Sequence, residues 1–362
     1  MLKILFLSTS VGALGSGQGG GVELTVQNVA QELQRKGHKL EVVAPNGSFL
    51  KGITVKAIAG NTQIPVQTQS RNVPICLPEN SVLANMWEYA RKVQHEWDLV
   101  VNFAFDWLPF YLTPFFERTT VAHFISMGSL TDATDSIMSQ VIKQYPGSFG
   151  VYTQSQADTF PFADACEILG SGLDLSLYQF CARPGESLAW LGRIAPEKAL
   201  EDAVEAVNIT GTPLKIFGKI QDKDYWDKIR QDFPDAPIEY VGFLSTVELQ
   251  QELGKCRALL MTPRWIEAFG NVAIEALACG VPVIAYQRGG PSEIVKHGET
   301  GFLVEPDSVA GLVEAIKNID KIERSRCRQQ AEAEYSLPAL GDRFEAWLNS
   351  VISNQLSVIS YQ

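Results

Sequence analysis

The sequence predicts an α/β protein of two doubly wound, Rossmann-like domains. Short apolar runs alternate with amphipathic stretches of helical length along most of the chain. That alternation is typical of parallel sheets covered by helices on both faces. The chain has 362 residues, which is more than one ordinary core accommodates. Residues 170–187 lack any period and carry several glycines and prolines, so we place a linker there.

The first domain is expected at residues 1–169. An apolar strand is followed by a glycine-rich loop at 12–21 and by apolar residues at helical spacing that stop at Gly37. The polar stretch 61–80 contains three prolines and predicts a long surface loop, a kind of segment that often carries function. The strands of this domain are predicted at residues 3–8, 39–44, 98–102, 119–125, 149–153 and 166–169.

The second domain is expected at residues 188–335, and a terminal segment at 336–362 contains a helix at about 338–351. Ligands of doubly wound sheets bind beyond the carboxyl ends of the strands, so functional residues should follow strands. A ligand is expected in a cleft where the two domains face each other. The strands of the second domain are predicted at residues 187–191, 214–217, 238–241, 258–261, 281–285 and 302–304.

The amino-acid composition limits the classes of molecule that the chain is expected to bind. The formal net charge of −11 disfavours binding to nucleic acid or anionic membranes. No apolar run has the length of a membrane span. The six cysteines form no C-x-x-C pair and are interpreted as buried free thiols of a reducing compartment. We therefore expect a cytoplasmic protein with no metal, no cofactor and no integral membrane association, and the oligomeric state stays open.

The glycine-rich loop, with glycines at positions 15, 17, 19, 20 and 21, lies between the first strand and the first helix. Glycines there allow a backbone to approach an anion next to a positive helix start. The spacing matches G-x-G-x-x-G, but the second strand ends at Asn46 without the acid that would bind a dinucleotide ribose. The alternative is a flexible turn.

Two cations follow the predicted strand at 187–191. Arg193 lies just past its end, and Lys198 lies in the first turn of the next helix. The helix dipole disfavours a cation at that place, so its presence is mild support for an anionic partner such as a diphosphate. The alternative is solvated surface charge.

The most informative segment contains two acids separated by seven residues, Glu267 and Glu275. Glu267 lies in a loop after a strand, and Gly270 precedes a helix that contains Glu275. A loop acid beside helix amides can orient sugar hydroxyls, and an acid further into the helix can bind a pair of ribose hydroxyls. Glu275 has apolar neighbours, and a carboxylate in such surroundings needs a partner.

At this point the sequence resembles a known family, the retaining glycosyltransferase family 4. The resemblance covers nearly the whole chain and is weakest over residues 48–118. Further matching segments are Gly19-Gly-Gly-Val-Glu23, Arg35-Lys-Gly-His38, Gly192-Arg193, Glu197-Lys198 and Gly242-Phe-Leu. The strongest are Pro263, Glu267-Ala-Phe-Gly, Glu275-Ala-Leu-Ala-Cys-Gly-Val-Pro-Val-Ile, Gly289-Gly290, Glu293-Ile-Val and Thr300-Gly-Phe-Leu-Val.

The resemblance implies a GT-B fold, a nucleotide-sugar donor, retention of configuration and no required metal. It implies that Glu275 holds the ribose, Glu267 the donor sugar, and Arg193 with Lys198 the diphosphate. His123 matches a histidine near the transferred sugar, although by composition a core histidine is the commoner case. The other implied donor-binding residues are Gly19, Gly20, Gly21, Gly242, Phe243, Leu244, Ala268, Phe269, Gly270, Asn271 and Val272.

The N-terminal loop is most similar to that of UDP-glucose:tetrahydrobiopterin glucosyltransferases. This narrower resemblance implies transfer of a hexose, glucose by first expectation, from a UDP-sugar to a small acceptor such as a reduced pterin. Asn102 ends a predicted strand, and Asp106 and Trp107 follow it. An acid there could bind an aminopyrimidine edge, and an aromatic ring could stack on it. The alternative is that the aromatic residues are core and Asp106 caps a helix.

Other functions remain open. The chain could act on a lipid or polysaccharide acceptor, or it could be a nucleotide-sugar epimerase of the same fold. A nicotinamide oxidoreductase is disfavoured by the missing acid after the second strand. The D-x-D pattern at Asp222 and Asp224 opens a predicted helix, where acids are expected for dipole reasons, so we interpret it as capping and not as a metal site.

Overall fold

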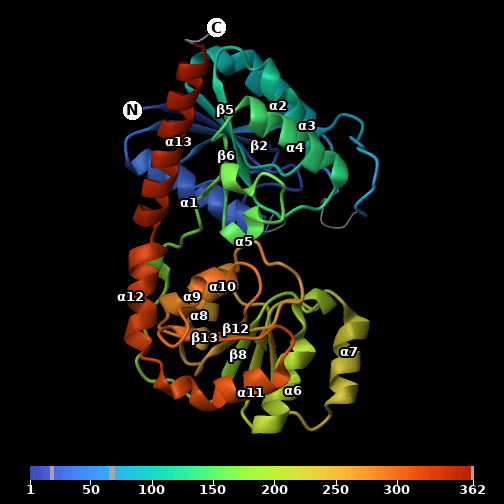
Figure 1. Ribbon diagram of the computed structural model, residues 1–362, viewed down its shortest axis with the longest axis vertical. Coiled ribbons are helices and arrows are strands. Elements are labelled where there is room, and N and C mark those ends of the chain that lie inside the picture. The colour runs from blue at the N-terminus through green and yellow to red at the C-terminus, as the bar shows by residue number, and fades with distance from the viewer. Residues whose placement is uncertain (17–19, 65–69, 360–362) are drawn as a thin grey trace. The chain divides into compact units, whose positions relative to one another are not determined.

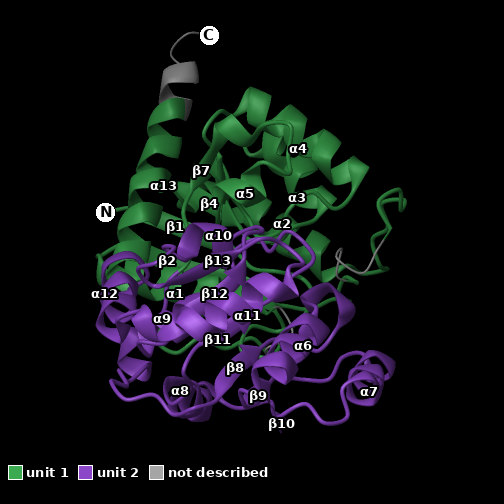
Figure 2. Cartoon of the chain, turned by 60° about the horizontal axis from the view of Figure 1, so that its bottom comes forward, with its two compact units in different colours: residues 1–171, 337–362 green, residues 172–336 purple. Residues whose placement is uncertain are grey.

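The computed structural model describes residues 1–16, 20–64 and 70–359. The chain divides into two compact units (Figure 2). Unit 1 consists of residues 1–171 and 337–362, and unit 2 of residues 172–336. Each unit contains one parallel sheet with helices around it, so the predicted α/β class with two Rossmann-like sheets is confirmed.

The described part of unit 1 forms a seven-stranded parallel sheet of order β3-β2-β1-β4-β5-β6-β7. The order reverses between β1 and β4, and this is the switch point of the sheet. The strands are β1 (Lys3–Leu7), β2 (Lys39–Pro45), β3 (Thr54–Ile58), β4 (Leu99–Asn102), β5 (Thr120–Ile125), β6 (Phe149–Val151) and β7 (Cys166–Ile168). The helices are α1 (Gly21–Arg35), α2 (Val82–Val93), α3 (Trp107–Leu112), α4 (Asp132–Gln144), α5 (Gln154–Ala157) and α13 (Leu337–Ile359).

The core of unit 1 follows from its apolar strands. The central strands β1, β4 and β5 are buried along almost their whole length, as expected of strands covered on both faces. Trp87 and Met86 of α2 pack against one side, together with Leu5 and Val100. A second cluster packs under α4 around Phe149.

The last helix, α13, belongs to unit 1 although it is far from that unit in the sequence (Figure 1). It lies beside α1, where Gly341 leaves room for the Glu32 side chain: a Cβ at this glycine would lie 2.1 Å from Glu32 Cγ. Phe344 packs on Phe124 of β5 with ring centroids 5.3 Å apart. Arg343 donates hydrogen bonds to the carbonyls of Leu169 and Ser171.

The described part of unit 2 forms a six-stranded parallel sheet of order β10-β9-β8-β11-β12-β13. Its switch point lies between β8 and β11. The strands are β8 (Leu188–Leu191), β9 (Leu214–Phe217), β10 (Ile238–Gly242), β11 (Leu259–Met261), β12 (Val283–Tyr286) and β13 (Gly301–Val304). The helices are α6 (Leu200–Thr210), α7 (Lys223–Asp232), α8 (Thr246–Gly254), α9 (Asn271–Ala278), α10 (Pro291–Ile294), α11 (Val309–Asn318) and α12 (Arg324–Glu334).

The two ends of unit 2 lie side by side. The amide of Leu173 donates to the carbonyl of Tyr335 at 2.8 Å, and Leu173 forms a parallel β-bridge with Ser336. The chain therefore enters and leaves this unit at neighbouring points.

Most strands lie where the sequence predicts them. Two expectations, one about a strand and one about the cysteines, are not met. The edge strand β3 was not predicted, because its side chains are largely exposed and give no apolar run. Three of the six cysteines depart from the expectation of buried thiols: one is exposed (Cys76) and two are half-buried (Cys166 and Cys181). The other three, Cys256, Cys279 and Cys327, are buried. Residues 62–64 and 70–80 form neither helix nor strand, as predicted for the surface loop. Within the described residues, no helix is both long and apolar enough to cross a membrane.

Candidate functional site

The predicted donor residues of unit 2 gather around the switch point of its sheet. Arg193 and Lys198 follow β8, and Glu267 follows the neighbouring strand β11. Because the carboxyl ends of parallel strands meet at one edge, two segments distant in sequence supply one group of side chains there.

Lys198 and Glu267 form the centre of this group. The Lys198 ammonium pairs with Glu267 Oε2, and both side chains are about four-fifths buried, with exposures of 20% and 18%. Trp265 donates its indole N–H to the same oxygen at 3.0 Å, and the Lys198 ammonium lies 4.9 Å from the centroid of the indole ring. A cation, an acid and an aromatic ring are thus held together. Trp265 lies within the motif segment, but its sequence position gave no sign of this role.

The backbone beneath this group is fixed by Thr262. Its hydroxyl lies 3.0 Å from the Lys198 carbonyl and 2.8 Å from the Ala199 carbonyl, to which it can donate. Trp190 donates to the same hydroxyl at 3.3 Å. Ala199 has a φ of 45°, which is a strained value for a residue with a side chain. The strain is therefore stored at the turn that presents Lys198.

The paired glycines after β12 allow a close backbone approach to Glu267. Gly290 donates its amide to the Glu267 carbonyl at 2.7 Å. A Cβ at Gly289, whose φ is +67°, would lie 2.5 Å from the Glu267 amide nitrogen, and one at Gly290 would lie 2.2 Å from the Phe269 carbonyl oxygen. No other residue fits either position without moving the loop.

The start of α9 offers backbone donors. Gly270, with a φ of 97°, precedes the helix, and no side chain of the described residues caps it. Asn271 begins the helix, and its buried side-chain oxygen has no hydrogen-bond partner within the described chain. The amide ends and dipole of an uncapped helix start favour an anion. Ala268 and Val272 are half-buried on either side, and Phe269 is buried with its ring 6.1 Å from that of Tyr335.

Glu275 lies one turn into α9 and has a partner of its own. The Tyr178 hydroxyl donates to Glu275 Oε1 at 3.1 Å. Burial raises the pKa of Glu275 to about 7, and the Tyr178 hydrogen bond limits that rise. The expected need of this carboxylate for a partner is met by a residue of the predicted linker.

Arg193 lies at the edge of the group and is exposed. It binds Gln221 through one guanidinium nitrogen, and a second donates to Glu197 at 3.0 Å. Glu197 and Gln221 also line a hollow of about 380 Å³. Asp222 lines this hollow too and accepts from the Tyr225 amide at 2.9 Å, so it caps α7 as predicted.

Gly242, Phe243 and Leu244 lie at the carboxyl end of β10, two strands from β8. Gly242 accepts from the Gly218 amide at 2.8 Å, and its φ of 92° requires a glycine. The Phe243 ring is 68% exposed, and the Lys219 ammonium lies 4.7 Å from its centroid. Phe243 therefore faces solvent, whereas Gly242 and Leu244 are half-buried, at the same sheet edge as Arg193.

In unit 1 the glycine-rich loop is described only in part. Gly17 and Gly19 lie outside the described residues. Gly20 precedes α1 with a φ of 62°, and Gly21 is the first residue of the helix. The amide of Gly15 donates to Glu23 at 3.1 Å.

His123 and Asn102 are fully buried in the core of unit 1. The Asn102 amide lies 3.1 Å from His123 Nδ1, and the Thr113 hydroxyl lies 2.9 Å from His123 Nε2. Asn102 also bonds the backbone of Ala104 through both ends of its amide. Burial lowers the pKa of His123 to about 3, so the ring is neutral. This geometry favours the core alternative for His123 and keeps the Asn102 side chain from reaching the sheet edge.

Asp106 caps α3, as the structural alternative proposed. It accepts from the Leu108 amide at 3.4 Å and from the Gln63 side chain at 2.8 Å. Burial raises its pKa, and these hydrogen bonds oppose the rise. Gln63 makes this contact through its side-chain nitrogen. Its side-chain oxygen, Oε1, is buried and has no hydrogen-bond partner among the described residues. Trp107 is half-buried and stacks on Tyr111 with centroids 4.6 Å apart.

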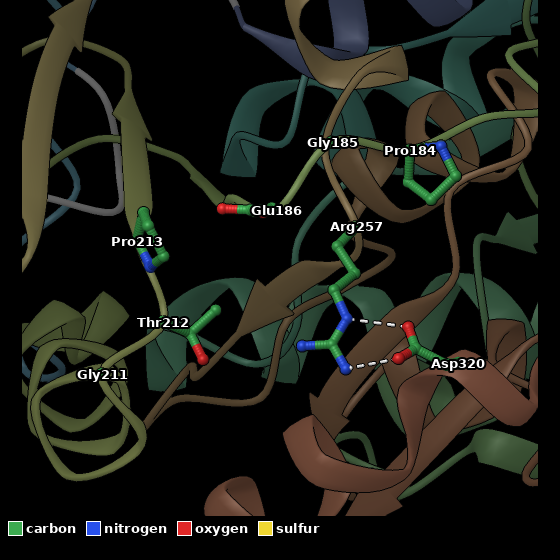
Figure 3. A pocket seen from close by; sticks show the side chains of 8 residues that line it. All are labelled: Pro184, Gly185, Glu186, Gly211, Thr212, Pro213, Arg257 and Asp320. Atoms are coloured by element: carbon green, nitrogen blue, oxygen red, sulfur yellow. Dashed lines mark hydrogen bonds and ion pairs between the residues drawn. The ribbon is translucent and has the colours of Figure 1, made fainter.

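A different cavity of about 390 Å³ lies at the amino ends of β8 and β9 (Figure 3). Arg257 and Asp320 point toward each other there and form a two-fold ion pair at 2.7 and 2.8 Å. None of the predicted site residues lines this cavity. It lies at the amino ends of the strands, whereas ligands of doubly wound sheets bind at the carboxyl ends. In the part of the chain that the structure describes, no three His, Cys, Asp or Glu side chains gather closely enough to hold a metal ion.

Comparison with known proteins bears on unit 2 in particular. The family described as "Glycosyl transferases group 1" matches residues 185–334. Glycogen synthase of Mycobacterium tuberculosis is 33% identical over 163 residues, which are 42% of this chain and 39% of that protein. A sucrose synthase of Solanum tuberosum is 41% identical over 59 residues, 16% of this chain and 7% of the relative. The match thus spans less than half the length of these relatives.

Solved structures match nearly the whole chain at low identity. The crystal structure of Anabaena Alr3699/HepE in complex with UDP and glucose has a TM-score of 0.74 and 19% identity, covering 97% of this chain and all of that one. Sucrose-phosphate synthase from Thermosynechococcus elongatus has a TM-score of 0.77 and 18% identity, covering 98% of this chain and all of that one. The two sheets thus have the GT-B fold of these structures, and residues 185–334 match the family of group 1 glycosyl transferases.

Proposed function

We propose that the chain is a retaining, metal-independent glycosyltransferase that moves a hexose from a UDP-sugar to a small acceptor. Unit 2 binds the donor, and unit 1 binds the acceptor. The observation that carries the proposal is the group of Lys198, Glu267 and the uncapped start of α9 at one switch point, within a segment that matches glycosyl transferases.

The diphosphate of the donor is bound by positive charge. When the bond from the anomeric carbon breaks, negative charge grows on the departing diphosphate. Lys198, Arg193 and the α9 amides stabilise this charge, and they are fixed beforehand by the contacts of Thr262, Glu197 and the paired glycines. Held cations can do without a metal the work that a divalent ion does in other transferases.

The two acids take different parts of the donor. Glu267, whose Oε2 contacts both Lys198 and Trp265, orients the hydroxyls of the sugar. Glu275 accepts hydrogen bonds from the ribose hydroxyls. Phe269, Gly270 and their neighbours border the sugar through their backbone.

Retention follows from the resemblance to family 4. The acceptor attacks on the face from which the diphosphate departs, and the leaving phosphate oxygen takes the acceptor's proton. UDP and glucose are supported as donor parts by the Anabaena structure, which contains both.

For the acceptor we propose a reduced pterin such as tetrahydrobiopterin, bound near Asp106 and Trp107. The support is the N-terminal loop resemblance and the pair of Asp106 with the unsatisfied Gln63, which could bind N–H groups of an aminopyrimidine. A saccharide acceptor is the second candidate, because the glycogen synthase and sucrose synthase relatives are named for saccharide products.

The proposal is tested by calorimetry and turnover. UDP should bind with the same affinity in the presence and absence of EDTA, and UDP release from UDP-glucose should require an acceptor. Tetrahydrobiopterin, maltooligosaccharide and fructose are compared as acceptors. A strict need for a divalent ion would contradict the metal-independent site, and turnover with saccharides alone would replace the pterin assignment.

A further inference from the structure

Tyr178 lies outside the predicted donor-binding motif, but its side chain contacts Glu275, a residue of that motif. It is 97 residues from Glu275 in sequence, and it follows the short turn Leu175–Leu177 in the predicted linker. Its side chain is buried, with 5% exposure, and its hydroxyl reaches Glu275 Oε1 at 3.1 Å. We propose that Tyr178 is a positioning residue that fixes the Glu275 carboxylate for a ligand diol. This inference rests on the proposed function.

The backbone that carries Tyr178 is held on several sides. Arg328 of α12 donates to the Tyr178 carbonyl at 2.8 Å and to the Ala278 carbonyl, at the end of α9, at 2.7 Å. The next amide, of Gln179, donates to the Gln250 side chain of α8 at 3.1 Å. These shared contacts hold the backbone of Tyr178 and the end of α9 together. They therefore fix the distance between the Tyr178 hydroxyl and the Glu275 carboxylate.

The geometry leaves the carboxylate able to bind a ligand. Each carboxylate oxygen accepts two hydrogen bonds, so Oε1 can accept from Tyr178 and from one hydroxyl while Oε2 accepts from a second. A pair of neighbouring hydroxyls on a ribose matches this arrangement. Without the tyrosine hydroxyl, a carboxylate in this apolar helix face would favour its protonated form, which accepts fewer hydrogen bonds.

Among Glu275, Tyr178 and Cys279, only Glu275 has a pKa near neutrality. Burial raises the pKa of the Cys279 thiol to about 12 and raises the pKa of Tyr178. Asp174 lies on the same segment as Tyr178, and Arg324 and Arg328 approach Cys279 from α12. The ionised form of Glu275, which the tyrosine hydroxyl favours, gains population as the pH rises through about 7.

The test is the affinity of the full chain for UDP from pH 7 to about 9.5, a range above the ionisation of the diphosphate. Tyr178→Phe keeps the ring and removes the donor. A hydrogen bond to a charged group corresponds to a tenfold to hundredfold effect, so the midpoint of the pH profile should shift upward by about one pH unit or more. The loss of affinity should be largest near pH 7, about fivefold or more, and should vanish at the alkaline end.

The matched control is Tyr89→Phe in unit 1, which removes another tyrosine–glutamate hydrogen bond of 3.1 Å, to Glu41. It should leave the profile unchanged. Glu275→Gln provides the second check, because Tyr178→Phe should have no further effect on UDP affinity in that background.

An equal loss of affinity at every pH, no loss at all, or full additivity with Glu275→Gln would overturn the role of Tyr178. The failure of the proposed function looks different. If the wild-type chain binds no UDP, the proposed donor site is wrong, and the proposed role of Tyr178 is wrong with it. If the wild-type chain binds UDP and Tyr178→Phe binds it equally well near pH 7, the positioning role alone is wrong.

Discussion

Replacing Lys198 by methionine should separate catalysis from folding. Methionine keeps the length and apolar stem of lysine and removes the charge. At an effective dielectric constant of about 20, a cation about 4 Å from a unit of developing negative charge contributes about 4 kcal/mol. That value corresponds to roughly 10³ in rate. Because 20% of the Lys198 side chain is exposed and solvent screens it, we expect a loss of about 10² to 10³ in kcat/KM.

The stability of the same variant should change little. The Lys198–Glu267 pair is about four-fifths buried, so its loss should cost about 1 to 2 kcal/mol in the free energy of unfolding, more than an exposed pair contributes and less than a fully buried one. Trp265, which donates to Glu267 at 3.0 Å, is unchanged in the variant and remains as a partner of this carboxylate. A thermal unfolding scan should therefore show a melting temperature within a few degrees of the wild type.

The assay is UDP release under saturating acceptor, with Lys215→Met as the control. Lys215 and Glu252 form a comparable ion pair at 2.8 Å, with exposures of 24% and 31%, outside the donor group. Its loss should leave turnover within about twofold. Retention of turnover within about threefold by Lys198→Met, or an equal loss in Lys215→Met, would refute the role of Lys198 at the diphosphate.

Three further predictions concern other residues. Glu275→Ala should weaken UDP binding by calorimetry, whereas Glu267→Ala should mainly lower kcat; equal losses of binding without a separate effect on turnover would contradict this division. Asp106→Ala should raise the acceptor KM by about tenfold and leave UDP affinity unchanged, and a matching loss of UDP affinity would mean that the change acts through folding. Gly290→Ala should lower the melting temperature and abolish turnover, because its Cβ would lie 2.2 Å from the Phe269 carbonyl oxygen; a stable, active variant would show that the loop can move.

The sequence predicts the central strands well because they are continuously apolar. Phe6, Val100 and Ile284 lie in runs that only a strand buried on both faces explains. The edge strand β3 escapes the same reasoning, since Thr54 and Lys56 are solvated and its pairing with β2 depends on the neighbouring strand.

The candidate site was predictable to the extent that it is local. Glu267, Gly270 and Glu275 share one segment, and their spacing alone indicates a loop acid and a helix acid. Tyr178 comes from a segment with no period, and nothing in its surroundings points to a carboxylate 97 residues away.

His123 shows the opposite limit. A histidine within a predicted strand matches the family histidine near the transferred sugar, yet by composition a core histidine is the commoner case, and only its neighbours decide between the two. Thr113 and Asn102 occupy both ring nitrogens, and they come from two other segments of the chain. Side-chain satisfaction of this kind depends on tertiary packing, which no periodicity encodes.

The joined ends of unit 2 make it an insertion in the chain of unit 1. Leu173 and Ser336 are neighbours, so the 165 residues of unit 2 begin and end at one place. Inserted domains of this kind can be excised or transplanted, because the host needs only a short splice where they leave. In an evolutionary sense unit 2 could be exchanged between hosts without redrawing either sheet, and an engineer could graft it onto a different scaffold by the same two joints.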